Sequence, residues 1–232
     1  MISQRLRPRW WGLWQTTLLP ARRAVLRRRV GRLVTESVEG IDLVVLPDVF
    51  NPRVFGSSNC LVRAVRQAAP SAARVLELGT GTGVNAIAAA MLGSDVVATD
   101  INPAAVRCAR MNVTMHALEG RIDVRHGDLF APVQGETFDL VLFNPPFFDG
   151  SPASERDRAW RSTDVLERFG AGLGDALAPG GRALVVVSSH GGQQRTLDAL
   201  ERGGLVVTPM LVTDHGYEVV TIIEARKRTQ AT

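Results

Sequence analysis

Cysteine, histidine and long apolar runs are scarce in this sequence. Its 232 residues include two cysteines, Cys60 and Cys108, and four scattered histidines. Because neither residue type recurs at the spacing that zinc sites use, we expect no bound metal and interpret both thiols as reduced packing residues. No run of about 18 apolar residues occurs, so no membrane span is expected. These absences predict a metal-free cytoplasmic protein.

Asp and Glu are absent from the first 34 residues, which carry nine arginines, whereas the whole chain has a net charge of +4. The Arg-rich residues 5–32 suit an electrostatic contact with RNA, the ribosome, an acidic protein or a membrane surface. A solvated segment with no specific partner is the alternative. Apolar residues at helical spacing over 21–34 predict an amphipathic helix. The three tryptophans within 10–14 are either an anchor on the same chain or a platform for a base.

The segment after this basic extension is typical of a β-hairpin followed by a helix. Residues 32–46 alternate in the manner of two strands, with Glu39-Gly40 as the turn. Ser57 or Ser58 can cap a helix that runs to about Gln67. We therefore predict three regions, which are a basic extension over 1–34, a hairpin and helix over 35–70, and a core over 71–228.

A glycine-rich turn separates a strand from a helix at the start of the core. An apolar run over 75–78 suits a buried strand, and an alanine-rich helical pattern covers 84–92. Between them stand three glycines at every second position, namely Gly79, Gly81 and Gly83. Glycine lets the backbone adopt positive φ and approach a ligand closely, and the following helix offers unpaired N–H groups. The turn therefore predicts a nucleotide-binding site.

The spacing of this turn argues against a nicotinamide dinucleotide. The dinucleotide pattern Gly-x-Gly-x-x-Gly/Ala, counted from Gly79, requires a small residue where the chain has Val84. A Tyr-Lys catalytic pair of the kind expected in a nicotinamide oxidoreductase is also absent after the fourth strand. The turn instead has an acid, Glu77, two residues ahead of its first glycine.

Strands and helices alternate along the rest of the core, which favours βαβ units and a parallel sheet with helices on both faces. The expected elements are strands over 96–99, 121–125, 138–143 and 183–188, helices over 103–116, 162–178 and 193–202, and a terminal antiparallel pair over 205–213 and 217–225. We expect Pro179-Gly180-Gly181 to end the helix before the strand over 183–188.

The strongest functional signal follows the strand over 138–143, where the chain reads Asn144-Pro145-Pro146-Phe147. Two consecutive prolines stiffen the backbone, and the carbonyls near them stay free to accept hydrogen bonds. Asn144 adds a side-chain carbonyl, and Phe147 adds a flat apolar face. Together these groups suit the binding of a planar NH2 group through its two hydrogens.

These motifs resemble those of the class I S-adenosylmethionine-dependent methyltransferases, in the Asn-Pro-Pro-aromatic branch that methylates amide or exocyclic amine nitrogens. The resemblance, over about residues 45–228, implies an α/β, Rossmann-like fold. Its seven-stranded sheet would be mostly parallel, with an antiparallel C-terminal strand and helices on both faces. It also implies N-methyl transfer from bound S-adenosyl-L-methionine. The implied catalytic residues are Asn144, Pro145, Pro146 and Phe147, and the implied cofactor-binding residues are Glu77, Gly79, Thr80, Gly81, Gly83, Asn85, Asp100, Ile101, Asp128, Leu129 and Asn144.

The resemblance gives expected roles to three of these residues. Asp100 ends the second strand of the core and would accept both ribose hydroxyls. A structural role as helix N-cap, at Asp100 or Asn102, is the alternative. Asp128 would lie near the adenine amino group and Leu129 near the ring face, although an ordinary turn also accounts for Asp128.

Two further stretches are candidates for the walls of the site. Phe50-Asn51-Pro52 and Ser57-Ser58 loosely match a family segment that closes over the cofactor and the target nitrogen. A plain loop and helix cap is the alternative. The polar loop over 148–162 follows the carboxyl end of a strand, where ligands of α/β sheets bind, and could shape the substrate entrance.

The acceptor is predicted from the last motif residue. The resemblance is closest to the release-factor-type protein glutamine methyltransferases, whose motif usually ends in Tyr where this chain has Phe147. A Phe is also usual in relatives that methylate guanine or adenine amines in RNA. A protein glutamine amide is the predicted acceptor, and a base amine of rRNA or tRNA or a small-molecule amine is the alternative. A non-catalytic module that binds nucleic acid is more remote, since Asn144 and the glycines are intact.

Overall fold

The computed structural model describes residues 29–54, 56–69, 72–146, 148–151, 161–216 and 218–228. The predicted basic extension lies outside the described residues up to position 28, together with its tryptophans and most of its amphipathic helix. Phe147 and residues 152–160 of the predicted entrance loop also lie outside them. Of the helices in the described ranges, none is long and apolar enough to cross a membrane.

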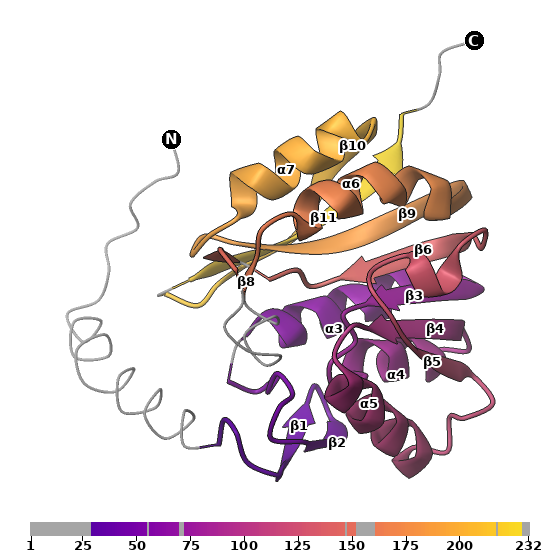
Figure 1. The fold of residues 1–232 in the computed structure, drawn as a ribbon, viewed down its shortest axis with the longest axis vertical. Helices are drawn as coiled ribbons and strands as arrows, with labels where there is room; N and C mark the ends of the chain where they lie inside the picture. Colours follow the sequence, from indigo (N-terminus) through magenta and orange to yellow (C-terminus); the bar gives the residue numbers. More distant parts are fainter. Residues whose placement is uncertain are drawn as a thin grey trace.

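A seven-stranded sheet forms the centre of the molecule, with the strand order β10-β11-β9-β6-β3-β4-β5 (Figure 1). Strands β9, β6, β3, β4 and β5 pair in parallel, and β11 runs antiparallel to both of its neighbours. The strands are β3 (Arg74–Leu78), β4 (Asp95–Asp100), β5 (Ile122–His126), β6 (Phe138–Phe143), β9 (Leu177–Ser188), β10 (Leu205–Asp214) and β11 (Val219–Lys227). The predicted mostly parallel sheet with an antiparallel C-terminal strand is confirmed.

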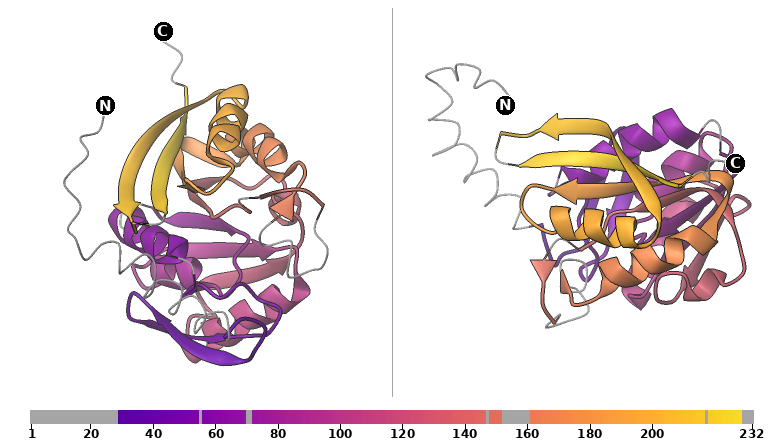
Figure 2. Two further views of the ribbon diagram at one scale, coloured as in Figure 1. Left: turned by 90° about the vertical axis from the view of Figure 1, so that its left-hand side faces the viewer. Right: turned by 90° about the horizontal axis from the view of Figure 1, so that it is seen from above.

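Helices cover both faces of the sheet, as predicted (Figure 2). The helices are α3 (Ser57–Ala68), α4 (Val84–Ala90), α5 (Pro103–Met115), α6 (Val165–Ala176) and α7 (Gln193–Arg202). Leu140 and Leu142 of β6 share a buried cluster with α3, α4 and α5. Val141 and Phe143 of the same strand share a second cluster with α6 and α7. Because successive residues of a strand point to opposite faces, β6 contributes to both halves of the core.

The predicted hairpin is present as β1 (Val34–Val38) and β2 (Ile41–Val45), which pair antiparallel. Its turn residues Glu39 and Gly40 both have positive φ, 51° and 82°, as a tight two-residue hairpin turn requires. Asn112 of α5 fixes the hairpin to the core, because its amide exchanges two hydrogen bonds with the backbone of Val44, at 2.8 and 2.9 Å. Asn112 also donates to the Thr82 carbonyl at 2.8 Å, so the same side chain joins the hairpin to the loop after β3.

The predicted boundary between the helix over 162–178 and the strand over 183–188 is wrong. Helix α6 ends at Ala176 and β9 begins directly at Leu177. Phe138 of β6 pairs with Leu177, while Leu140 pairs with Arg182, so the extra residues of β9 bulge between these two points. Pro179-Gly180-Gly181 forms this bulge within the strand, with φ +77° at Gly180, rather than a helix stop.

Helix α3 also begins differently from the prediction. Its extent is as expected, but the N-cap residue is Gly56, and no side chain caps the first turn. A Cβ atom at Gly56 would lie 2.7 Å from Nε2 of His215, so a larger residue at this position would require the His215 ring to shift. Ser57 and Ser58 are buried instead, and Ser58 lines the cavity described next.

Candidate active site

A cavity of about 260 Å³ lies where the carboxyl ends of β3, β4, β5 and β6 meet. Most of the residues predicted for the site line it, and this set is Gly79, Thr80, Gly81, Asn85, Asp100, Ile101, Asp128, Leu129, Asn144, Pro145 and Pro146. Glu77 and Gly83 are not in its lining. The fold thus brings together residues that are spread over 68 positions of the sequence, counting from Gly79 to Pro146.

The glycine-rich loop between β3 and α4 forms the floor of the cavity. Gly79, Gly81 and Gly83 all adopt positive φ, between 56° and 83°. A Cβ at Gly83 would lie 3.3 Å from Cβ of Ala109, so this glycine lets the loop pack closely on α5. Around Gly81, in contrast, no atom lies within 4 Å of such a Cβ, which leaves its backbone open to a ligand.

Glu77 lies beneath this loop and is 2% exposed. Its carboxylate accepts hydrogen bonds from Thr80 Oγ1 at 2.6 Å, from Asn85 Nδ2 at 2.8 Å and from the Ala86 amide at 3.1 Å. Burial is the main cause that raises the pKa of Glu77 to about 7, and the three donors oppose it. The carboxylate therefore ties the loop to the first turn of α4 from below.

At the end of β4, Asp100 faces the cavity and Asn102 starts the next helix. Asn102 is the N-cap of α5, because its Oδ1 accepts from the Ala104 amide at 2.8 Å. Asp100 accepts from the amides of Gly81 and Asn102 at 2.9 and 2.8 Å, and burial raises its pKa. The capping role falls to Asn102, and Asp100 keeps its remaining acceptor capacity for a ligand.

The segment after β5 brings Asp128 and Leu129 to the cavity wall. Asp128 forms an ion pair with Arg168 of α6 at 2.5 Å, and Arg168 also contacts Asp164 at 3.1 Å. The hydrogen bond to Asp128 raises the pKa of Arg168. Sequence reasoning missed Arg168, which lines the cavity and has no motif around it that would identify it.

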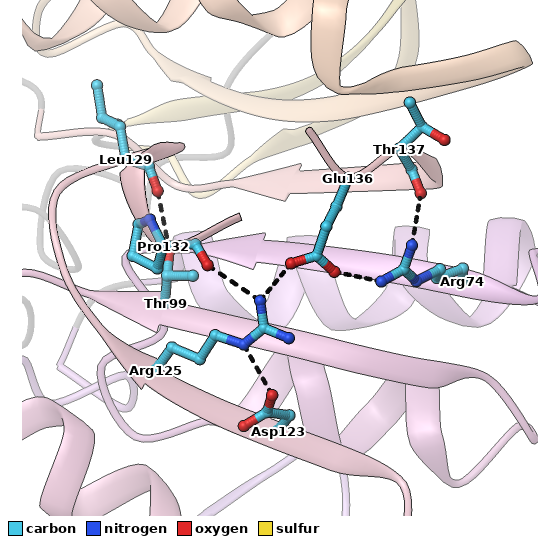
Figure 3. A network of polar contacts seen from close by, with 8 residues as sticks. All are labelled: Arg74, Thr99, Asp123, Arg125, Leu129, Pro132, Glu136 and Thr137. Atoms are coloured by element: carbon cyan, nitrogen blue, oxygen red, sulfur yellow. Dashed lines mark hydrogen bonds and ion pairs between the residues drawn. The ribbon is translucent and has the colours of Figure 1, made fainter. Parts of the chain in front are cut away.

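A network of ion pairs supports this segment from behind (Figure 3). Arg125 contacts Asp123 at 2.7 Å and Glu136 at 2.5 Å, and it donates to the Pro132 carbonyl at 3.0 Å. Arg74 holds the other oxygen of Glu136. These contacts fix the turn that follows Leu129, so the cavity wall is formed on a rigid base.

Asn144 lies at the end of β6, opposite Ser57 of α3. Its Nδ2 donates to Ser57 Oγ at 3.4 Å. Its Oδ1 is buried and has no hydrogen-bond partner among the described residues. Among the described residues, Asn85 Oδ1 is the other buried side-chain atom without a hydrogen-bond partner. Both asparagines line the cavity, so two buried acceptors stand beside it without donors.

The loop before α3 closes one side of the cavity with Phe50 and Pro52. Between them, Asn51 donates to Glu36 of β1 at 2.9 Å. Glu36 also pairs with Arg29 at 2.7 Å, and Asn102 holds the carbonyl of Asp48 at 2.9 Å. Glu36 is therefore a support for the loop that sequence reasoning did not identify.

The two cysteines are free and buried, as predicted. Cys60 packs in the core cluster of α3, and Cys108 packs between α5 and the hairpin. Within the described ranges, no group of His, Cys, Asp and Glu side chains is arranged to hold a metal ion.

The residues present fit S-adenosylmethionine. Asp100 offers acceptors for a ribose diol, the open backbone at Gly81 admits a ligand, and the unpartnered acceptor of Asn85 awaits a donor. In the sheet, β6, β3, β4 and β5 are consecutive, so these groups lie along one line that ends at Asn144.

The sequence matches the methyltransferase small domain family over residues 40–220. It is 30% identical to a protein of Methanocaldococcus jannaschii whose name proposes protein N5-glutamine methyltransferase activity, over 81% of this chain and 96% of that protein. It is 34% identical to the release factor glutamine methyltransferase of Geobacter sulfurreducens, over 56% of this chain and 47% of that enzyme. A solved structure, the 16S rRNA N2 methyltransferase of T. thermophilus in complex with AdoMet and guanosine, has a TM-score of 0.67 at 24% identity, over 85% of this chain and 50% of that chain.

Proposed function

The chain belongs to the methyltransferase small domain family and is an S-adenosylmethionine-dependent methyltransferase, and we propose that it methylates the side-chain amide nitrogen of a glutamine in a protein. The relatives named for glutamine methylation support this acceptor. The chain spans about half the length of the Geobacter sulfurreducens enzyme.

The observation that carries the proposal is the unpartnered Oδ1 of Asn144. A buried hydrogen-bond acceptor without a donor lowers the stability of the fold by about 1–3 kcal/mol. Such an atom beside a cavity therefore indicates that a ligand supplies the donor. A primary amide carries two N–H groups on a planar nitrogen. Asn144 Oδ1 would accept one of them, and the carbonyl of Pro145 would accept the other.

These two hydrogen-bond acceptors would be the contribution of the protein to the methyl-transfer step. The lone pair of an amide nitrogen is delocalised, and it is a poor nucleophile for that reason. Two fixed acceptors hold the NH2 group in one orientation and stabilise the positive charge that grows on nitrogen during transfer. The proposed role of Phe147, which lies outside the described residues, is to stack on the planar group.

When bound, S-adenosylmethionine supplies an electrophilic methyl group on a sulfonium. We assign its ribose to Asp100 and its adenine to the wall of Asp128 and Leu129, with the glycine-rich loop beneath. Glu77 and Gly83 would act indirectly, because they hold this loop without lining the cavity. Asn144, at the end of β6, would then hold the nitrogen of the methyl acceptor beside the bound cofactor.

An exocyclic amine of an RNA base is the second candidate, since it presents the same two N–H groups to the same acceptors. The basic extension is its main support. We propose that the Arg-rich residues 5–32 contact the ribosome, RNA or an acidic partner in either case. A substrate in the translation machinery places the enzyme in the cytoplasm as part of this proposal.

Labelled S-adenosylmethionine, incubated with the protein and a lysate, tests the acceptor. Label that protease releases, and that returns as methylglutamine after complete proteolysis, supports the proposal. Label that ribonuclease releases contradicts the glutamine acceptor and supports an RNA base amine instead. Label in small molecules alone contradicts both polymer acceptors. The Asn144→Ala protein in the same lysate is the control for transfer by other enzymes.

A smaller effect is expected from Ser57, which fixes the amide of Asn144. Ser57→Ala removes the acceptor at 3.4 Å, so the Asn144 side chain can turn away from the orientation that presents Oδ1. A neutral hydrogen bond of this kind contributes about 0.5–1.5 kcal/mol, so kcat should fall by up to about tenfold. Turnover measured at saturating cofactor gives this fall, and cofactor titration checks that the Kd of the cofactor is unchanged. An unchanged kcat contradicts this role of Ser57.

A further inference from the structure

The proposed binding of the substrate amide at Asn144 leaves the second unpartnered hydrogen-bond acceptor, Oδ1 of Asn85, unexplained. Asn85 lies in the first turn of α4, 6% exposed, and lines the cavity. Its Nδ2 donates to Glu77 Oε1 at 2.8 Å. Both oxygens of Glu77 accept hydrogen bonds, so the amide nitrogen of Asn85 turns toward Glu77 and the amide oxygen turns away from it. That oxygen has no partner among the described residues.

The position of Asn85 along the sheet indicates which part of the cofactor is near. Asn85 is hydrogen-bonded to Glu77 of β3. Strand β3 lies between β4 and β6 in the sheet; β4 ends at Asp100, and Asn144 follows β6. With the ribose at Asp100 and the methyl group directed at Asn144, the amino acid moiety of the cofactor falls over β3. This step rests on the proposed function.

The chemistry of Oδ1 then selects one group of that moiety. The amino acid moiety contains an α-ammonium, an α-carboxylate and a sulfonium. An amide oxygen accepts hydrogen bonds and repels a carboxylate, and the α-ammonium is the N–H donor of the three. We propose that Asn85 Oδ1 accepts a hydrogen bond from the α-ammonium of S-adenosylmethionine and that Glu77 is the positioning residue that orients it.

Glu77 strengthens this contact in two ways. The hydrogen bond that it accepts from Nδ2 polarises the amide of Asn85, which makes Oδ1 a better acceptor. Thr80 and Ala86 donate to its other oxygen, so the carboxylate cannot rotate away from Asn85. Neither effect requires the carboxylate to touch the cofactor.

Binding of cofactor analogues tests the proposal without any turnover. The probes are S-adenosylhomocysteine, the same molecule without its α-amino group, and 5′-methylthioadenosine, which lacks the whole amino acid moiety. Isothermal titration of the full chain gives Kd for each probe. The wild type should bind S-adenosylhomocysteine about 10- to 100-fold more tightly than the deamino analogue, because hydrogen bonds to charged groups contribute more than neutral ones.

Asn85→Leu should lose most of this preference while it binds 5′-methylthioadenosine within about threefold of the wild type, a change below 1 kcal/mol. Retained binding of that probe also shows that the variant is folded.

Three results overturn the proposal. One is an Asn85→Leu protein that prefers S-adenosylhomocysteine over its deamino analogue as strongly as the wild type does. Another is a wild type without this preference. The third is an equal loss of all three probes, which would place Oδ1 against the nucleoside. Failure of the wild type to bind S-adenosylhomocysteine at all overturns the assignment of the cavity as well, so the two failures are distinguishable.

Discussion

Replacing Asn144 with alanine should reduce the rate of methyl transfer by about a thousandfold. The change removes the hydrogen-bond acceptor that orients the substrate nitrogen, and loss of one such preorganised group in an active site lowers the rate by about 100- to 1,000-fold. The Kd of S-adenosylmethionine should stay within about tenfold of the wild-type value, since most residues proposed to bind the cofactor lie outside β6. Single-turnover transfer measures the first quantity, and equilibrium titration measures the second.

Asn144→Asp is the matched control for this change. It preserves the size of the side chain and an acceptor oxygen at its end, so it should retain more activity than the alanine variant. An alanine variant with wild-type turnover would contradict the proposed mechanism. An aspartate variant as inactive as alanine, with normal cofactor binding, would instead indicate that the NH2 group of Asn144, which contacts Ser57, is the part that matters.

The second large effect concerns Glu77 and the pH dependence of folding. Its pKa is raised from 4.5 to about 7, mainly by burial and to a lesser degree by the charge of Asp100 on β4. The first turn of α4 presents no acidic residue to it. A carboxyl group with a raised folded-state pKa stabilises the fold fully below its unfolded pKa, and this contribution is lost as the pH rises through the folded pKa.

Between pH 4.5 and 7.5 the cofactor-free protein should therefore lose on the order of 3 kcal/mol of unfolding free energy through Glu77. Glu77→Gln removes the titration, so its unfolding free energy should fall less over the same range. Urea unfolding at several pH values, with the two proteins compared at each, isolates this term because Asp100 and the surface carboxylates are common to both. Parallel curves would show that Glu77 does not change its protonation on unfolding.

The sequence was sufficient for the features that depend on local spacing. The glycine-rich turn, the strand that ends at Asp100 and the hairpin turn at Glu39-Gly40 all follow from residues close together in the chain. The Pro179-Gly180-Gly181 bulge could not be predicted from the local sequence, because the pairing of β9 with β6 includes these residues in a strand. Tertiary pairing there overrides the local tendency to stop.

The site shows the same division. Ser57 has the residue type of a helix cap, but Gly56 is the N-cap of α3 and no side chain caps its first turn. The Ser57 hydroxyl instead accepts a hydrogen bond from Asn144. The unpartnered oxygens of Asn85 and Asn144 are properties of burial, which no spacing rule reports. Arg168 reaches Asp128 across 40 residues, and neither residue carries a local signal for the other.

The place of β11 in the sheet has a consequence for the nascent chain. This strand comes last of the described strands, yet it lies between β9 and β10, which precede it. During synthesis, β9 therefore presents an open edge until residues 219–227 leave the ribosome, and open edges of apolar strands pair with other chains. Because β11 separates β10 from β9, β10 can join the sheet only after β11 has been translated, whereas the residues that line the cavity all precede β9 in the chain.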